Sequence, residues 1–247
     1  MAKKLYILSI GAGGTKYMTT EALEALADCQ IVVGYRNYVK ELKELIGEKP
    51  TLMSGMVKEK DRAYEAVELA KGGQTTCIVT NGDANVFGTA TLISEIMEEQ
   101  ELWDELEVIS VAGVTALLAT ASRVGAPIGQ DFAVISLSNK VTDPLVIDKK
   151  VKAVLHADFV LGIYNPKSKK KFLPYLNFLE ALKEGEERVI IIASQVGREK
   201  EKITITTSSD LIAQELEHPE VGMATLIIVG NFQTKVTSNG LVFTPRA

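Results

Sequence analysis

Short apolar runs alternate with amphipathic helix patterns along almost the whole of this chain of 247 residues. The run Thr75–Thr80 reads as a short buried strand, and residues 58–70 form a strong helix pattern that stops at Gly72-Gly73. Strands that alternate with helices are typical of α/β folds with a largely parallel sheet. The sequence therefore predicts an α/β fold.

The alternation pauses at Gly125-Ala126-Pro127-Ile128-Gly129 and restarts with a strand pattern at 132–137. A chain of this length can form one large domain or two small ones. We therefore expect two α/β domains, residues 1–126 and 127–247, with an interdomain cleft. A terminal hairpin is expected over 232–243, turned by Asn239-Gly240.

Bulk composition excludes several classes of protein. The net charge of −5 argues against nucleic-acid binding, which usually needs a basic excess. No run of 18 apolar residues and no apolar signal core is present, which predicts a cytoplasmic protein without a membrane span. Cys29 and Cys77 are far apart in the sequence and form no C-x-x-C pair. Cys77 lies inside an apolar strand pattern, so we expect a buried, inert thiol there, and we expect neither a metal site nor a disulfide framework.

The loop Asn81–Gly88 is the strongest candidate for a ligand site. It follows the strand at 75–80, and ligands of parallel α/β sheets bind outside the carboxyl ends of strands. Gly82 and Gly88 would let a ligand approach the backbone, and Asp83 supplies a carboxylate. The alternative is that Asp83 is the N-cap of the next helix.

Two further turns follow strand patterns. The turn Ser9–Thr15 is rich in glycine, but Lys16 stands where a dinucleotide fingerprint needs glycine, and Gly34-Tyr35-Arg36 lacks its acidic residue. A nicotinamide site is therefore not expected. The turn Val111–Thr115 should lie beside the Asp83 loop if the two preceding strands are neighbours, as successive strands often are. Thr115 could contact a ligand or could simply cap a helix.

The segment Tyr164–Lys171 carries four lysines in five positions of an acidic chain. It is either a solvated face or an anchor for an anionic substrate. His156 and His218 are the only histidines, and no G-x-S-x-G elbow is present, so a hydrolytic triad is not expected.

Together these turns resemble those of the tetrapyrrole methylase family, the S-adenosylmethionine enzymes of corrin and siroheme synthesis. The resemblance covers nearly the whole chain. Residues 9–19 (SIGAGGTKYMT) resemble the family's opening G-x-G-P-G-D-P-x-x-x-T, Gly82-Asp83 its G-D-P loop, and residues 112–115 its P-G-V-T turn. Further segments resemble the branch that methylates C17 of the macrocycle and contracts the ring: Val33-Gly34-Tyr35, Ser54-Gly55-Met56 with Lys58-Glu59, Gly125-Ala126-Pro127 with Asp131-Phe132, Tyr164-Asn165-Pro166, Gly197-Arg198-Glu199 and Gly230-Asn231 with Gln233-Thr234.

The chain departs from the family pattern at five positions. Small residues replace others in the loops: Ser9 a glycine, Ala12 a proline, Gly14 an aspartate and Ala84 the proline after Gly82-Asp83. These swaps should keep the backbone path. Gln130 stands where the branch commonly has histidine. No catalytic residue is therefore assigned.

The resemblance implies a homodimer that methylates C17 of precorrin-3B or cobalt-precorrin-3, with ring contraction, in cobalamin biosynthesis. It implies S-adenosyl-L-methionine as the cofactor and a polycarboxylate tetrapyrrole as the substrate. The implied cofactor-binding residues are Ile10, Gly82, Asp83, Val86, Val114, Thr115, Tyr164, Met223 and Ala224. The implied substrate-binding residues are Gly11, Gly13, Ser54, Met56, Lys58, Asn165, Lys167 and Arg198, with Arg62 and Lys169 as further candidates for the acidic side arms.

Two alternatives stay open. The chain could methylate another carbon in the corrin pathway, or it could be a non-catalytic tetrapyrrole-binding protein, which would have no need of the methyl donor. The sequence also leaves open whether the substrate holds cobalt.

Overall fold

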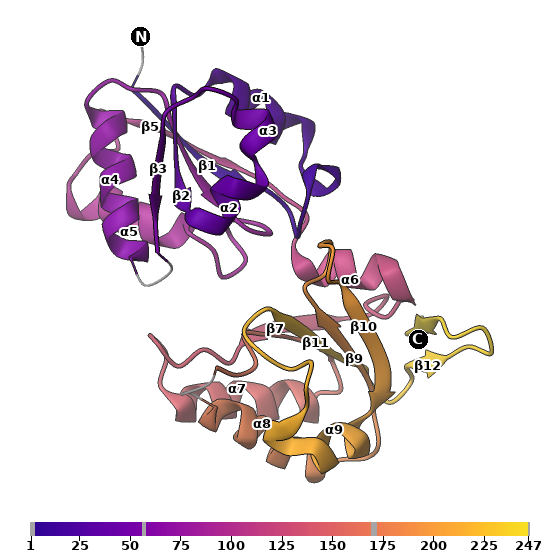
Figure 1. Cartoon of the computed structure of the whole chain (residues 1–247). Helices are drawn as coiled ribbons and strands as arrows, with labels where there is room; N and C mark the ends of the chain where they lie inside the picture. The colour runs from indigo at the N-terminus through magenta and orange to yellow at the C-terminus, as the bar shows by residue number, and fades with distance from the viewer. Residues whose placement is uncertain (1–2, 56–57, 169–171, 247) are drawn as a thin grey trace. The chain divides into compact units, whose positions relative to one another are not determined.

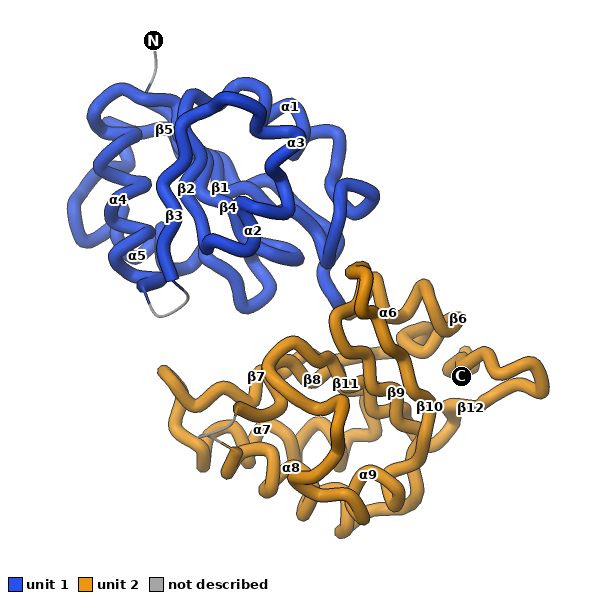
Figure 2. Tube along the Cα trace, viewed as in Figure 1, with its two compact units in different colours: residues 1–116 blue, residues 117–247 orange. Residues whose placement is uncertain are grey.

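The computed structural model describes residues 3–55, 58–168 and 172–246. It confirms the predicted α/β fold. The chain forms two compact units, residues 1–116 and 117–247 (Figure 2). This division lies ten residues before the boundary expected from the sequence, which was after residue 126. Helix α6 (Ala116–Val124) therefore lies almost wholly in the second unit. The side chain of Leu117 lies against Gly162, where an added Cβ would be 3.1 Å from it, and this contact belongs to the second unit.

A five-stranded sheet forms the centre of the first unit, in the order β3-β2-β4-β1-β5. All its neighbouring strands are parallel, as the alternating pattern predicts. Most of these strands read as apolar runs because both faces of the sheet are covered. The strands are β1 (Lys4–Ser9), β2 (Ile31–Tyr35), β3 (Thr51–Ser54), β4 (Thr76–Thr80) and β5 (Glu107–Val111).

Helices cover both faces of the first sheet (Figure 1). On one face, buried residues of α1, α2 and α3 pack with Leu8 and Val79, and on the other, α4 and α5 pack with Ile7 and Ile78. The helices are α1 (Thr20–Asp28), α2 (Arg36–Glu41), α3 (Lys43–Ile46), α4 (Glu59–Lys71) and α5 (Ala90–Glu99), with a 3₁₀ turn, η1 (Thr15–Tyr17).

The second unit contains a five-stranded sheet in the order β10-β9-β11-β8-β7, with one face covered by α7, α8 and α9. The strands are β7 (Phe132–Ser136), β8 (Val160–Tyr164), β9 (Val189–Ser194), β10 (Lys202–Thr207) and β11 (Thr225–Val229). The helices are α7 (Pro144–His156), α8 (Leu173–Lys183) and α9 (Ser208–Gln214), with a 3₁₀ turn, η2 (Glu215–Glu217).

The prediction of a largely parallel sheet is wrong for the second unit. Only β7 and β8 are parallel neighbours, and the other three pairs are antiparallel. The reason is the connection from β9 to β10, which contains no helix and reverses the chain direction. Strand β11 then inserts between β8 and β9 and runs against both.

The predicted terminal hairpin is confirmed: β12 (Lys235–Val236) pairs antiparallel with β13 (Val242–Phe243). Strand β6 (Gly125–Ala126) completes this small sheet by pairing with β13. Cys77 is buried, as predicted, and Cys29 is buried too. A hydrogen bond with Cys29, together with burial, raises the pKa of the Cys77 thiol and keeps it protonated. Among the described residues, no helix combines the length and apolar character that spanning a membrane requires.

Candidate functional site

Three turns meet at the carboxyl edge of the first sheet. They follow β1, β4 and β5, and β1 lies between the other two strands. Gly11 and Gly82 exchange two backbone hydrogen bonds, of 3.1 and 2.7 Å, which tie the first turn to the second. Both glycines have positive φ, +74° and +69°, a conformation that glycine adopts at little cost. The predicted ligand loops therefore form one backbone assembly.

Asp83 joins the second turn to the third. One carboxylate oxygen accepts a hydrogen bond from the backbone N–H of Gly113 at 2.9 Å, and the other accepts one from Asn85 at 2.8 Å. The alternative that Asp83 caps a helix is wrong, because α5 begins at Ala90 and Thr89 occupies its N-cap position. A carboxylate can accept further hydrogen bonds, so this geometry leaves a ligand role open.

The structure corrects the reason for the contact between these turns. Strands β4 and β5 are not neighbours, because β1 separates them. The turns still touch because residue 113 is glycine: an added Cβ would lie 2.4 Å from the Gly82 carbonyl oxygen and 2.6 Å from Ser9 Cβ. Contacts this short are not possible for real side chains, so the close approach depends on Gly113.

The predicted ligand residues of the first unit flank this assembly. Val86 and Val114 are half-buried, and Ile10, Gly13 and Thr115 are buried. Gly14 has φ +71° and is exposed, and an added Cβ there would meet no atom within 4 Å. The structure therefore leaves open space beside the glycine turn.

The predicted substrate residues after β3 form a separate cluster. Arg62 of α4 is buried, and its guanidinium donates to Ser54 Oγ at 2.9 Å, Gly55 O at 3.0 Å and Lys58 O at 3.3 Å. Arg62 therefore holds the loop between β3 and α4, a role that differs from the predicted contact with an acidic arm. Burial lowers the pKa of Arg62, yet an arginine stays charged. Lys58 is exposed, and Met56 lies outside the described residues.

Side chains dominate the corresponding edge of the second sheet. The phenol oxygen of Tyr164, at the end of β8, accepts a hydrogen bond of 3.0 Å from the backbone N–H of Leu117. Asn165 has φ +50° and donates to Ser136 Oγ, at the end of β7, at 3.0 Å. Tyr164 thus holds the first turn of α6, and Asn165 bridges two strand ends.

Met223 and Ala224 precede β11 at the same edge, since Leu226 is the register partner of Tyr164. The carbonyl of Ala224 accepts a hydrogen bond of 3.0 Å from the backbone of Gln195, just after β9. Arg198 lies in the loop that follows, and its backbone N–H donates to Gln195 O at 3.0 Å. The structure therefore brings Tyr164, Asn165, Met223, Ala224 and the loop that holds Arg198 to one edge of the second sheet.

Lys167 has partners that the sequence did not indicate. It is half-buried, donates to the carbonyl oxygen of Leu216, and lies 5.6 Å from the centre of the Tyr175 ring. Burial lowers the pKa of its ammonium group. This lysine is therefore not part of a solvated face. Lys169, Lys170 and Lys171 lie outside the described residues.

Gln130 occupies the position at which the resembling branch commonly has histidine. Its side-chain amide donates to the carbonyl oxygen of Pro245 at 3.0 Å. An amide does not titrate, so Gln130 offers no acid–base chemistry. Its observed role is to fix the C-terminal segment.

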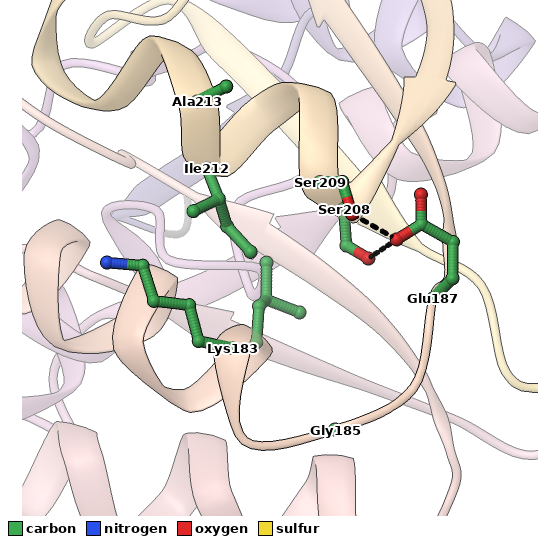
Figure 3. Close-up of a pocket in the computed structure, with 8 residues that line it drawn as sticks. Lys183, Gly185, Glu187, Ser208, Ser209, Ile212 and Ala213 are labelled. Carbon is green, nitrogen blue, oxygen red and sulfur yellow. Dashed lines mark hydrogen bonds between the residues drawn. The ribbon is translucent and has the colours of Figure 1, made fainter.

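A surface pocket lies at the opposite edge of the second sheet, where β9 begins and β10 ends (Figure 3). Glu187 accepts hydrogen bonds from Ser209 Oγ at 2.5 Å and Ser208 Oγ at 3.2 Å. The hydrogen bond from Ser209 is the main cause that lowers the pKa of the Glu187 carboxyl. The residues that line this pocket are Leu182, Lys183, Gly185, Glu187, Ser208, Ser209, Ile212 and Ala213. None of the predicted site residues that the structure describes is among them.

Sequence reasoning missed Ser9 as a residue of the site. Its side chain is fully buried, and its hydroxyl accepts a hydrogen bond of 2.8 Å from the backbone N–H of Ala84 in the Asp83 loop. The available signal was a polar residue at the end of an apolar strand, directly before a glycine turn. From the family resemblance, Ser9 was interpreted only as a small residue in place of a glycine.

Known proteins match this chain along most of its length. A probable cobalt-factor III C(17)-methyltransferase of Salmonella typhimurium is 38% identical and is aligned over 98% of each chain. A protein of Methanocaldococcus jannaschii with the same description is 36% identical over 98% of this chain and 96% of its own. A precorrin-3B C(17)-methyltransferase of Sinorhizobium is 33% identical over 100% and 97%.

Solved structures show the same fold. The methyltransferase CobJ is 30% identical, with a TM-score of 0.89 over 98% of this chain and 99% of its own. A uroporphyrin-III C-methyl transferase of Thermus thermophilus, complexed with S-adenosylhomocysteine, is 17% identical, with a TM-score of 0.70 over 92% of this chain and 97% of its own. The family model described as Tetrapyrrole (Corrin/Porphyrin) Methylases matches residues 4–212, and the chain belongs to that family.

Proposed function

We propose that this chain is an S-adenosylmethionine-dependent C17-methyltransferase that acts on precorrin-3B or cobalt-precorrin-3 and contracts the ring in cobalamin biosynthesis. The assembly of turns at Gly11, Gly82 and Gly113 carries the proposal, because it forms a rigid, largely backbone-built edge in a methylase of this family. Relatives at 33–38% identity along the whole chain carry C17-methyltransferase names and support the choice of carbon.

The chemistry suits a site made of turns. The cofactor supplies a methyl group on a positively charged sulfur. An electron-rich ring carbon attacks this methyl group in line, and the sulfur leaves as a neutral thioether. Such a displacement needs no covalent help from the protein, so positioning supplies most of the rate. The backbone carbonyls at this edge suit a cation whose removal from water is costly.

The residues proposed for the cofactor offer suitable chemical groups in each unit. In the first unit, Ile10, Val86 and Val114 offer apolar surface, while Gly82 and Thr115 contribute backbone and a hydroxyl. An added Cβ at Gly82 would lie 3.7 Å from Thr115 Cα, so its absence leaves room beside Thr115. In the second unit, Tyr164 and the Met223-Ala224 segment complete the set. Gly222, beside Met223, has no atom within 4 Å of an added Cβ, so that segment also borders open space.

The substrate is proposed to bind the glycine turn and several polar residues. Its acetate and propionate arms need cations, and Lys58, Lys167 and Arg198 are the described candidates. We propose that the remaining positions line the macrocycle: Gly11, Gly13, Ser54, Met56 and Asn165. We also propose that the protein acts in the cytoplasm as a homodimer.

Ring contraction requires proton transfer at a bridge oxygen, typically worth about 10²–10⁴-fold in rate. The Gln130 amide cannot serve as the acid or base, and it already donates to Pro245 O. The proposal therefore assigns contraction to this chain without a named proton carrier.

The decisive experiment uses precorrin-3B and cobalt-precorrin-3 in separate reactions, with a methyl donor labelled with ¹³C. Mass spectrometry and NMR should find one labelled methyl at C17 and a contracted macrocycle, and a parallel reaction without the protein should find neither. Label at another carbon would contradict the C17 assignment. Tight precursor binding without any methyl transfer would instead indicate a tetrapyrrole carrier.

A further inference from the structure

The loop after β4 contains a buried backbone donor that a side chain satisfies. Ala84 is 1% exposed, and its N–H donates to Ser9 Oγ at 2.8 Å. Ser9 is itself 0% exposed, at the last position of β1. An unpaired buried N–H is costly, so this bond fixes where the loop sits over β1.

Asp83 supplies two more acceptors, for Asn85 N–H at 2.8 Å and Gly113 N–H at 2.9 Å. The first bond closes a local turn, and Val86 N–H donates to Asp83 O across the same turn at 3.2 Å. The second bond reaches the turn after β5. Two neighbouring loop residues are therefore bonded to different strand ends: Asp83 to the turn after β5, and Ala84 to the last residue of β1.

The turn geometry explains why Ser9 is needed. The hydrogen bond from Val86 to Asp83 places Ala84 at the second position of a β-turn, a position that favours proline. Proline has no N–H and would need no acceptor. Alanine has a backbone N–H, and Ser9 Oγ accepts the hydrogen bond that this group donates. Two departures from the family pattern, serine at 9 and alanine at 84, thus compensate each other.

We infer that Ser9 and Asp83 are positioning residues, which hold the 81–86 loop and the 111–115 turn in the arrangement that receives the cofactor. Their oxygens act on backbone N–H groups of the protein, and the proposal gives neither oxygen a contact with the sulfonium or the reacting carbon. The inference rests on the proposed function for the identity of the ligand. The hydrogen bonds on which it is built stand independently of that identity.

The first test is a double-mutant cycle with Ser9→Ala, Ala84→Pro and the pair, followed by calorimetry with S-adenosylmethionine and S-adenosylhomocysteine. Ser9→Ala should weaken both ligands about fivefold or more and lower the unfolding temperature, because it leaves a buried N–H unpaired. The double variant should recover most of both losses. Ser110→Ala is the matched control, since Ser110 is exposed and accepts only a long hydrogen bond of 3.4 Å from the Asn85 side chain of the same loop.

Two results would overturn the role of Ser9: parent-like affinity in Ser9→Ala, or no recovery in a folded double variant. If proline prevents folding, Ser9→Thr replaces it, because threonine keeps the acceptor oxygen. It should retain affinity that Ser9→Ala loses, and equal losses in both variants would count against the inference.

The second test separates positioning by Asp83 from direct contact with the sulfonium. The two ligands differ in charge, so a carboxylate that touches the sulfonium should favour the cationic one. Asp83→Asn should weaken both ligands by the same factor if Asp83 acts through the backbone. A loss confined to S-adenosylmethionine, or no loss at all, would refute positioning.

A parent protein that binds neither ligand would refute the proposed cofactor, and the unfolding measurements of the Ser9 and Ala84 cycle would still decide whether the loop is held as described.

Discussion

The two units use different means to hold the strand ends that carry the predicted ligand residues. In the first, backbone groups pair with each other or with Ser9 and Asp83, and the packing needs glycine at 113. In the second, tyrosine, asparagine and lysine side chains reach across to backbone or hydroxyl partners. All strands of a parallel sheet end at the same edge, so the turns that follow them lie side by side. In the mixed sheet, one edge carries both strand starts and strand ends, and side chains connect them there.

This contrast predicts that substitutions in the second unit cost stability through lost side-chain partners, and those in the first through steric exclusion. Four substitutions test it.

The largest effect on stability is expected from Asp158→Asn in the second unit. Arg188 is 4% exposed and pairs with Asp158 at 2.9 Å, while donating to Gly230 O and Leu155 O. Removing one partner of a buried ion pair leaves the other charge buried without its counter-ion. Asp158 is partly exposed, so we expect the lower end of the usual range, about 3 kcal/mol, by urea unfolding.

Asparagine is chosen because Asp158 has φ +56°, which asparagine tolerates, and because its amide oxygen can still accept from Phe232 N–H. Glu180→Gln breaks the exposed Glu180–Lys183 pair in the same unit and should lower the free energy of unfolding much less, because water and salt screen exposed charges. Equal effects of the two substitutions would mean that the second unit does not rely on the buried pair.

Gly113→Ala tests the steric rule of the first unit. The added Cβ must displace the Gly82 carbonyl or Ser9, and forced overpacking of this kind costs about 1–3 kcal/mol. Cofactor affinity should fall at least tenfold, because the Asp83 loop would have to move. Calorimetry and urea unfolding measure the two effects.

The control is Gly185→Ala, where the nearest atom would lie 3.9 Å from the new Cβ. A fully stable Gly113→Ala protein that binds the cofactor normally would contradict the close packing of the three turns.

Local patterns in the sequence were enough to predict the fold class, most strand and helix positions and the terminal hairpin, because each depends on residues close in the chain. The order of strands was not predictable in the same way. Nothing near Thr80 or Val111 indicates that β1 lies between β4 and β5, and nothing near Gln195 indicates that the chain reverses into β10. Such choices depend on contacts between distant segments.

The candidate site shows the same division. Glycine turns at strand ends pointed to the residues around Gly11, Gly82 and Gly113, since backbone conformation is a local property. The partners of side chains were not predictable: Arg62 turns toward Gly55 O, Lys167 toward Leu216 O, and Ser9 toward Ala84 N–H. A lysine or arginine in a loop carries no local sign of which carbonyl it will reach.

Tyr164→Phe should have a smaller effect than either substitution above. It removes the acceptor of the Leu117 N–H and leaves the ring in place. We expect a loss of about 1 kcal/mol in the free energy of unfolding. Tyr64→Phe, which removes an exposed bond to Glu99 of 2.5 Å, is the control and should cost less. If the order is reversed, side-chain bonds at the second sheet edge do not stabilise α6 as the comparison requires.

The smallest effect should be a change in pH dependence, caused by His218 in the second unit. This side chain is 6% exposed, and its Nδ1 accepts from Glu220 N–H at 3.3 Å, which requires an unprotonated nitrogen. Burial lowers its pKa; the Glu220 carboxylate opposes this shift, while the charges of Lys167 and Lys202 reinforce it. The unfolded chain therefore binds a proton at higher pH than the folded protein does.

It follows that the folded protein has its full stability above the ordinary histidine pKa of 6.5 and loses part of it as the pH falls from there toward the lower folded value. His218→Asn should flatten the slope of unfolding free energy against pH between about 6.5 and 5, whatever it does to the absolute stability. The window stays above the range in which carboxylates titrate, so a slope unchanged by His218→Asn would show that this buried histidine does not act as a neutral acceptor.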